Sequence, residues 1–425
     1  MSLGVRIVAI PGAVEPALTR RIAKNTGWLL LSRLGSQGLA LLFSIVIARR
    51  LGEVGLGQYA FMASVVYLGN LTTTFGTDML IMREVAAKRD FSILSASLVL
   101  QLGLSVPYII AVFLLAPLIP NQSPVAADAL RLYSLALLPL AAYSVFSAAL
   151  RGLERMAAYT WLNLLNGALL AGLALVFILP DTPILTLAWL LLAVQIVSAL
   201  AAVGLFFAQG VNIRSWVLSW SGLGALLSAA APIAVLGLLG ALYQRTGIII
   251  LATQQGAADT GLFSAALRVV EAAKLGHFAL LGAIFPVMAQ AHAAPDPKLR
   301  AVFAKTLKLL LWVASVLAGL LFMVSPLLIP ALFGAEFAEA IPLLSQLAWL
   351  LIPVTLTHYF SLLLLSARQE RAILVSLAAS LVLLIAFVFA TLPALGLRAV
   401  VWGMLLAESI QAVLLITFWR KIESR

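Results

Sequence analysis

Long apolar segments separated by short polar ones repeat along almost the whole chain, from Trp28 to Trp419. A helix needs about 20 mostly apolar residues to cross the hydrocarbon core of a bilayer. Runs of that length predict about twelve transmembrane helices. We place them near residues 26–48, 57–77, 92–116, 126–149, 157–179, 184–208, 221–250, 257–288, 305–329, 338–365, 371–392 and 396–419. The pattern predicts an all-α polytopic membrane protein, with no interruption long enough for a soluble catalytic domain.

The composition agrees with this interpretation. Of the 425 residues, 63% are hydrophobic and 10% are charged, whereas a soluble domain carries about 25% charged residues. The chain has no cysteine, which excludes disulfides, thiol catalysis and cysteine-ligated metals. Its three histidines are far apart in sequence and form no metal-binding motif. We therefore expect no metal and no cofactor.

Basic residues are concentrated in alternate loops. With the N-terminus inside, nineteen of the 27 Lys and Arg residues fall in cytoplasmic segments and three in the opposite loops. This asymmetry is typical of inner-membrane proteins, and it explains the net charge of +11 without nucleic-acid binding. We expect a multi-pass protein of the cell inner membrane, with both the N-terminal segment 1–25 and the tail 420–425 in the cytoplasm.

Two short segments, 52–60 and 256–264, share two glycines and an aromatic residue at the same spacing. A shift of 204 residues superposes Gly52 on Gly256, Gly57 on Gly261 and Tyr59 on Phe263. Each segment follows the first span of a six-span half, so the halves have the same orientation and a pseudo-twofold axis along the membrane normal. We expect an N-terminal lobe at 26–208, a cytoplasmic linker at 209–220 and a C-terminal lobe at 221–419. Two such lobes can rock about a central site, which favours a carrier over a channel or an enzyme.

Several charged residues fall within predicted spans or near their ends. They are Arg33, Arg245, Arg268, Glu271, Lys274 and Glu408. Inserting a charged side chain at the centre of a span costs on the order of 2.5–3.5 kcal/mol. Such residues normally face a bundle interior or an aqueous cavity, and here the cations outnumber the acids. We expect Arg33, Arg245, Arg268 and Lys274, with Gln37 one turn beyond Arg33, to bind an anionic substrate. We expect Glu271 and Glu408 to balance charge or to couple transport to H⁺ or Na⁺. In an alternative interpretation, Arg268, Glu271 and Lys274 form a salt-bridge cluster that only fixes helix packing.

The local motifs resemble those of a known family. Residues 48–60 (ARRLGEVGLGQYA), then 75–78 (FGTD) and 83–86 (REVA), resemble the opening of Wzx-type polysaccharide biosynthesis flippases of the multidrug/oligosaccharidyl-lipid/polysaccharide exporter superfamily. The region from Gly256 to Pro286 is similar to the seventh-to-eighth helix region of that family. The resemblance implies a two-lobed carrier that moves an undecaprenyl-pyrophosphate-linked oligosaccharide across the inner membrane by alternating access. Its partners would be membrane lipid, the lipid-pyrophosphate-linked glycan and glycan-assembly proteins, and we expect a monomer.

Three other functions remain open. A cation-coupled multidrug antiporter of the same superfamily would favour intramembrane acids, which are outnumbered here. A membrane glycan-assembly enzyme would be expected to need a sizeable surface loop with carboxylates or histidines, and the predicted loops are short. A nontransporting scaffold is the remaining alternative. The sequence favours a secondary transporter that is not an enzyme.

Overall fold

The computed structural model describes residues 16–89, 91–211, 220–274 and 297–423, and within these ranges every regular element is a helix. The first half of the chain contains α1 (Pro16–Thr74), α2 (Thr77–Lys88), α3 (Ser92–Leu115), the 3-10 turn η1 (Ala116–Leu118), α4 (Pro124–Ser134), α5 (Leu137–Gly152), α6 (Met156–Phe177) and α7 (Ile184–Phe207). The second half contains α8 (Trp220–Gln254), a helix through 257–274, α10 (Pro297–Phe333), η3 (Ala335–Glu339), α11 (Ala340–Ala348), α12 (Leu351–Ser366), α13 (Glu370–Leu395) and α14 (Leu397–Glu423).

The helices agree with the predicted spans. Among the described residues, nine helices are long and apolar enough to cross a membrane, or ten when α11 and α12, which meet at 42°, count as one bent span. The segment α1 holds two predicted spans, separated at Gly52, whose φ of 66° is one that glycine adopts without strain. The helix at 257–274 corresponds to the first part of the predicted eighth span.

Some boundaries differ from the prediction. Residues 16–25, predicted as a segment before the first span, are already helical in α1. The second predicted span does not end at residue 77, because the chain breaks at Phe75 and Gly76, both with positive φ, and then continues as α2. Residues 1–15, the centre of the predicted linker (212–219) and the second part of the eighth span (275–288) lie outside the described residues.

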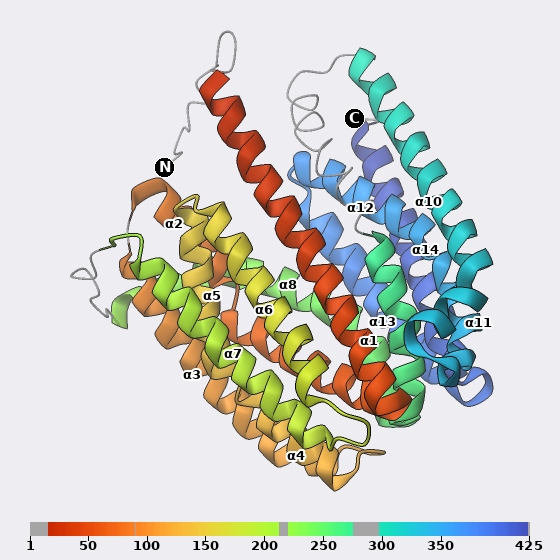
Figure 1. Cartoon of the computed structure of the whole chain (residues 1–425). Helices are drawn as coiled ribbons and strands as arrows, with labels where there is room; N and C mark the ends of the chain where they lie inside the picture. The colour runs from red at the N-terminus through yellow and green to blue at the C-terminus, as the bar shows by residue number, and fades with distance from the viewer. Residues whose placement is uncertain (1–15, 90, 212–219, 275–296, 424–425) are drawn as a thin grey trace.

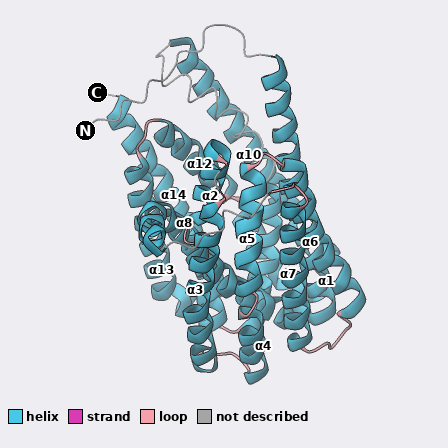
Figure 2. Cartoon of the chain, turned by 90° about the vertical axis from the view of Figure 1, so that its left-hand side faces the viewer, coloured by secondary structure: helices cyan, strands magenta, loops and turns pink. Residues whose placement is uncertain are grey.

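The helices form two bundles, one from each half of the chain (Figure 1). In the first, α1 packs on α6 and α5 packs on α7, while in the second α14 packs on α13 and α12. The most extensive contact between the bundles is that of α8 with α1. Figure 2 shows most of the long helices running in roughly the same direction along the molecule.

The two bundles converge at one end and diverge toward the other (Figure 1). We call the end at which α1 bends back on itself the crossing end. We call the opposite end, where α1 begins and α14 finishes, the terminal end. Two sets of residues are therefore of interest: those between the bundles and those at the crossing end. A movement of one bundle relative to the other would change the contacts of both sets.

Candidate functional site

The two glycine segments found in the sequence pack against each other at the crossing end. A Cβ on Gly57 would lie 1.7 Å from the Ala257 carbonyl oxygen, and one on Gly261 would lie 1.9 Å from the Glu53 carbonyl oxygen. The 204-residue shift that relates Gly57 to Gly261 also relates Glu53 to Ala257. The two contacts are therefore equivalent under the pseudo-twofold axis, and only glycine permits the backbones to approach so closely.

Hydrogen bonds also join the lobes at this end. Three side chains of the first half donate to the last carbonyls of two helices in the second: Arg49 to Ala331 and Leu332 of α10, Asn121 to Thr253 of α8, and Gln122 to Ala252 of α8. The last four carbonyls of a helix have no partner within it. These side chains satisfy them across the lobe boundary, so the crossing end is held closed by polar as well as apolar contacts.

Arg268 and Glu271, both on the helix at 257–274, form an ion pair. The Nη1 atom of Arg268 lies 3.2 Å from Oε2 of Glu271, and the side chains are 19% and 28% exposed. In the alternative interpretation of the sequence, Arg268, Glu271 and Lys274 form a salt-bridge cluster. The structure shows the Arg268–Glu271 part of that cluster.

Lys274 faces a different environment from Arg268. It interacts electrostatically with Glu408 and Glu271 but forms no ion pair within 4 Å among the described residues. Glu408, on α14, is buried and accepts a 2.7 Å hydrogen bond from the hydroxyl of Tyr243 on α8. The buried Glu408 is thus joined to α8 by a hydrogen bond, whereas Lys274 forms no ion pair with it.

Arg245 lies between the lobes. Its guanidinium carbon is 4.7 Å from the ring centroid of Tyr67 on α1, which is within the range of a cation–π interaction. Its Nε is buried and has no hydrogen-bond partner in the described structure. Tyr243 is two residues away, about 200° around the helix, so α8 presents Tyr243 to α14 and Arg245 to the first lobe.

Arg33 and Gln37 are exposed on α1. The opposite side of α1 packs on α6, where Gly35 contacts Leu164 and Gly167 contacts Leu39. Arg33 forms no ion pair with the described part of the chain.

The structure therefore does not bring the predicted site residues into one cluster. Arg268 and Glu271 form an ion pair, Glu408 is hydrogen-bonded to Tyr243, and Lys274 has no carboxylate within 4 Å among the described residues. Arg33 and Gln37 are exposed on α1, and Arg245 lies between the lobes on the ring of Tyr67. Their roles in substrate binding stay a prediction. No set of three or more His, Asp or Glu side chains in the described ranges could hold a metal ion.

The tyrosine partners of the charged residues could not be found from the sequence. Tyr67 and Tyr243 lie in apolar spans that contain no charge pattern to single them out.

Comparison with solved structures identifies the architecture as that of multidrug/oligosaccharidyl-lipid/polysaccharide superfamily transporters. A multidrug resistance MATE family transporter of this superfamily in an inward-facing conformation is 17% identical, with a TM-score of 0.76 over 93% of this chain and 98% of that one. A superfamily transporter from Pyrococcus furiosus, described by the reverse polarity of its binding pocket, is 17% identical with a TM-score of 0.68 over 95% and 96% of the two chains. An outward-facing structure of a MATE family transporter is 16% identical, with a TM-score of 0.63 over 95% of each chain.

The polysaccharide biosynthesis protein family matches residues 22–292, which is more than half of the chain. The chain belongs to that family, as the motifs in the sequence indicated. No curated protein matches the sequence.

Proposed function

We propose that the chain moves an undecaprenyl-pyrophosphate-linked oligosaccharide or polysaccharide repeat unit across the cytoplasmic membrane by alternating access. The observation that supports this substrate class most directly is Arg245. It lies between the lobes, rests on the ring of Tyr67 and has no carboxylate partner in the described structure. A guanidinium in a low-dielectric setting binds phosphate oxygens through its fixed fork of donors.

The charge balance supports an anionic substrate as well. Arg33, Arg245, Arg268 and Lys274 carry four positive charges, whereas Glu271 and Glu408 carry two negative ones. The Arg268–Glu271 pair cancels locally, so the surplus rests on the cations that are not paired. A pyrophosphate head group would neutralise that surplus, while the lipid tail remains in the bilayer.

The lobe contacts suggest which side of the membrane the site faces. The proposed orientation, with both termini in the cytoplasm, places the crossing end outside. The glycine contacts and the helix-end hydrogen bonds close that end, so the site would be open to the cytoplasm, where lipid-linked glycans are loaded. The higher TM-score with an inward-facing transporter, 0.76 against 0.63 with an outward-facing one, is consistent with this state.

Glu408 is the better candidate for coupling to H⁺ or Na⁺. It is buried, whereas Glu271 is committed to Arg268. A buried carboxylate held by one hydroxyl changes its interactions when it gains a proton or a cation.

Transport can be measured with purified protein in proteoliposomes, using a fluorescent lipid-pyrophosphate-linked oligosaccharide whose outer-leaflet fraction is quenched. The double variant Arg33→Ala, Arg245→Ala should lower the transport rate at least about tenfold, because a hydrogen bond to a charged group contributes about 1.5–3 kcal/mol. Arg131→Ala is the matched control, since Arg131 pairs with Asp128 near the crossing end. Wild-type rates in the double variant would remove these two residues from the site.

A multidrug antiporter is the second candidate, supported by the likeness to MATE family structures and by the buried Glu408. Its signature would be efflux of organic cations from the same proteoliposomes, lost in Glu408→Gln and unaffected by Arg33→Ala. Transport of neither substrate class would favour a glycan-assembly enzyme or scaffold.

A further inference from the structure

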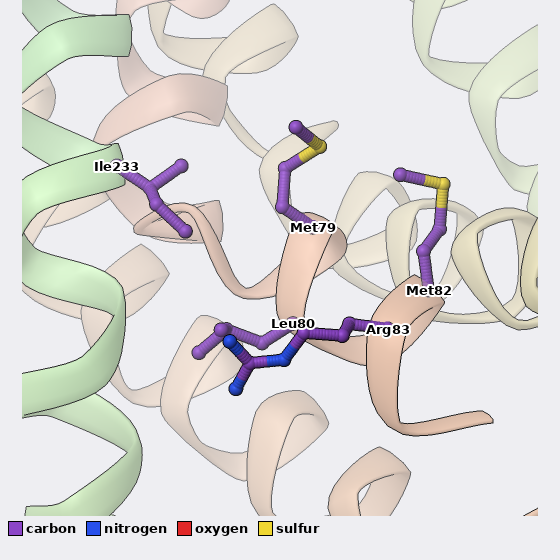
Figure 3. A pocket seen from close by; sticks show the side chains of 5 residues that line it. All are labelled: Met79, Leu80, Met82, Arg83 and Ile233. Carbon is purple, nitrogen blue, oxygen red and sulfur yellow. The ribbon is translucent and has the colours of Figure 1, made fainter. Parts of the chain in front are cut away.

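A pocket of about 440 Å³ lies where α2 of the first lobe meets α8 of the second. Figure 3 shows the side chains that line it: Met79, Leu80, Met82, Arg83 and Ile233. The break before α2 brings the two helices together, because a Cβ on Gly76 would lie 3.0 Å from the backbone nitrogen of Ala234 and from Cβ of Ile233. The pocket is therefore formed by both lobes.

The walls of this pocket are apolar except at one side. Met79 is 51% exposed although it is a large hydrophobic residue. The exposed thioether and the Ile233 side chain provide a surface suited to a flexible hydrocarbon chain. The pocket is largely open, and its volume of about 440 Å³ leaves room for part of a single acyl chain rather than a long polyprenyl chain.

The remaining side carries positive charge. The Arg83 side chain is 68% exposed, and its only ion pair within the described structure is with the adjacent Glu84, 3.3 Å away. Glu84 is shared, because Lys88 Nζ lies 2.8 Å from its other oxygen. With Arg89 next in the chain, the surface at residues 83–89 has three cations for one carboxylate.

We infer that this pocket binds an anionic phospholipid of the surrounding membrane, with one acyl chain against Met79, Leu80, Met82 and Ile233 and the phosphate against Arg83. The α2 helix runs toward the terminal end, so Arg83 lies one turn nearer that end than Met79. This is the order in which a lipid presents its phosphate and its chain when the terminal end faces the cytoplasm. Anionic lipids of that leaflet are attracted to basic residues at this depth.

The bound lipid bridges the lobes, because its chain contacts Ile233 of α8 while its phosphate contacts Arg83 of α2. It would therefore stabilise the arrangement in which the two helices are close. This role does not depend on the identity of the transported substrate.

Native mass spectrometry of the full-length protein in detergent tests this inference. The protein is supplied with equal amounts of phosphatidylglycerol and phosphatidylcholine, and the retained ratio is measured. The wild type should retain phosphatidylglycerol preferentially. Arg83→Gln should lower that preference about fivefold, which corresponds to about 1 kcal/mol per basic residue near a membrane surface.

Two further variants distinguish lipid binding in the pocket from general electrostatic attraction between the protein and an anionic lipid. Lys88→Gln removes an equal charge from the same helix but no pocket-lining side chain, so it should change the ratio by less than twofold. Met79→Trp fills the pocket without changing the charge and should reduce retention of both lipids. Equal effects of Arg83→Gln and Lys88→Gln, or full retention by Met79→Trp, would overturn the assignment.

Inorganic phosphate distinguishes a lipid site from a site for free phosphate. Phosphate added at millimolar concentration should leave phosphatidylglycerol bound, because the acyl chain contributes to its affinity. Displacement of the lipid by phosphate alone would show that the pocket recognises only the anion and would contradict the inference.

Discussion

At the residue scale, the spacing of Tyr243 and Arg245 separates two kinds of chemistry. Two residues on one helix point to nearly opposite sides, and here one meets a carboxylate inside the second lobe and the other meets a tyrosine of the first. The charge of Glu408 is thereby kept away from Arg245. Among the described residues, no carboxylate lies within 4 Å of Arg245 to compete for it.

The hydrogen bond from Tyr243 should contribute measurably to stability. Tyr243→Phe leaves an oxygen of the buried Glu408 without its donor, and we expect the free energy of unfolding to fall by about 1.5–3 kcal/mol. The measurement is chemical unfolding in detergent micelles. Tyr159→Phe is the control, because the Tyr159 ring lies under Arg151 and its hydroxyl makes no hydrogen bond within the described ranges. Similar losses in both variants would contradict a specific role for Tyr243.

The charged members of the candidate site and the Arg268–Glu271 pair could be predicted from the sequence, but the tyrosine partners could not. An arginine in an apolar run is rare and costly, so Arg33, Arg245 and Arg268 stand out at once. Tyrosine is compatible with a span, and nothing in the sequence indicates that Tyr67 faces Arg245. The Arg268–Glu271 pair follows from a spacing of three residues, whereas the contact between Tyr243 and Glu408 joins residues 165 positions apart.

At the scale of elements, the crossing of the two glycine segments depends on the absence of side chains. In Gly57→Ala the new Cβ would overlap the backbone of Ala257, so the crossing end could not close without a shift of one lobe. We expect faster labelling of a cysteine introduced at Thr260, which is buried beside the crossing. The rate of reaction with a membrane-impermeant maleimide should rise several-fold, and the chain has no native cysteine to interfere.

Gly103→Ala is the control for this substitution. Gly103 is also in a helix, but its added Cβ would meet nothing within 4 Å. Unchanged labelling in Gly57→Ala, or an equal rise in Gly103→Ala, would show that the glycine contact does not hold the crossing end closed.

Helices could be located from the sequence more accurately than their breaks. Apolar runs define spans because a buried backbone in lipid must satisfy its own hydrogen bonds. The break at Phe75–Gly76 is stabilised by packing against α8, at Ile233 and Ala234. That contact lies about 160 residues away in the chain, so no local pattern reveals it. The α2 helix was accordingly predicted as a loop.

At the scale of the whole molecule, the repeat and the hydropathy pattern were sufficient to predict a two-lobed bundle. They did not predict which end of the lobes would be joined, because that depends on long-range contacts such as Arg49 with α10. The candidate site is less predictable than the fold for the same reason. Its geometry is set by how α1, α8 and the helix at 257–274 pack, and the sequence encodes that packing only indirectly.

Closure of the crossing end should depend on pH. Burial raises the pKa of Glu53, at the junction of the two spans in α1, above its usual 4.5, and the nearby carboxylates of Glu339, Glu336 and Asp259 raise it further. When the lobes separate, hydration and distance would lower that pKa again, so the closed state binds more protons. Acidic solution on this side should therefore favour closure, and the stabilisation should be lost as the pH rises through the raised pKa.

Spin labels on cysteines introduced at Val54 and Gln255, both exposed and one in each lobe, can report this motion. The fraction of short interlabel distances should fall as the pH rises from acidic to neutral. Glu53→Gln should flatten the dependence. An identical pH profile in that variant would assign the effect to other groups.

The reciprocal contact of Gly57 with Ala257 and of Gly261 with Glu53 has the self-complementary geometry of a homodimer interface, in which each partner offers the same surface. A half-length ancestor with this segment could have paired with a copy of itself in the same way. Fusion of the two copies would then have freed each position to diverge from its counterpart. The acidic residue at position 53, whose counterpart at position 257 is alanine, is the kind of asymmetry that a single gene encoding identical subunits cannot acquire.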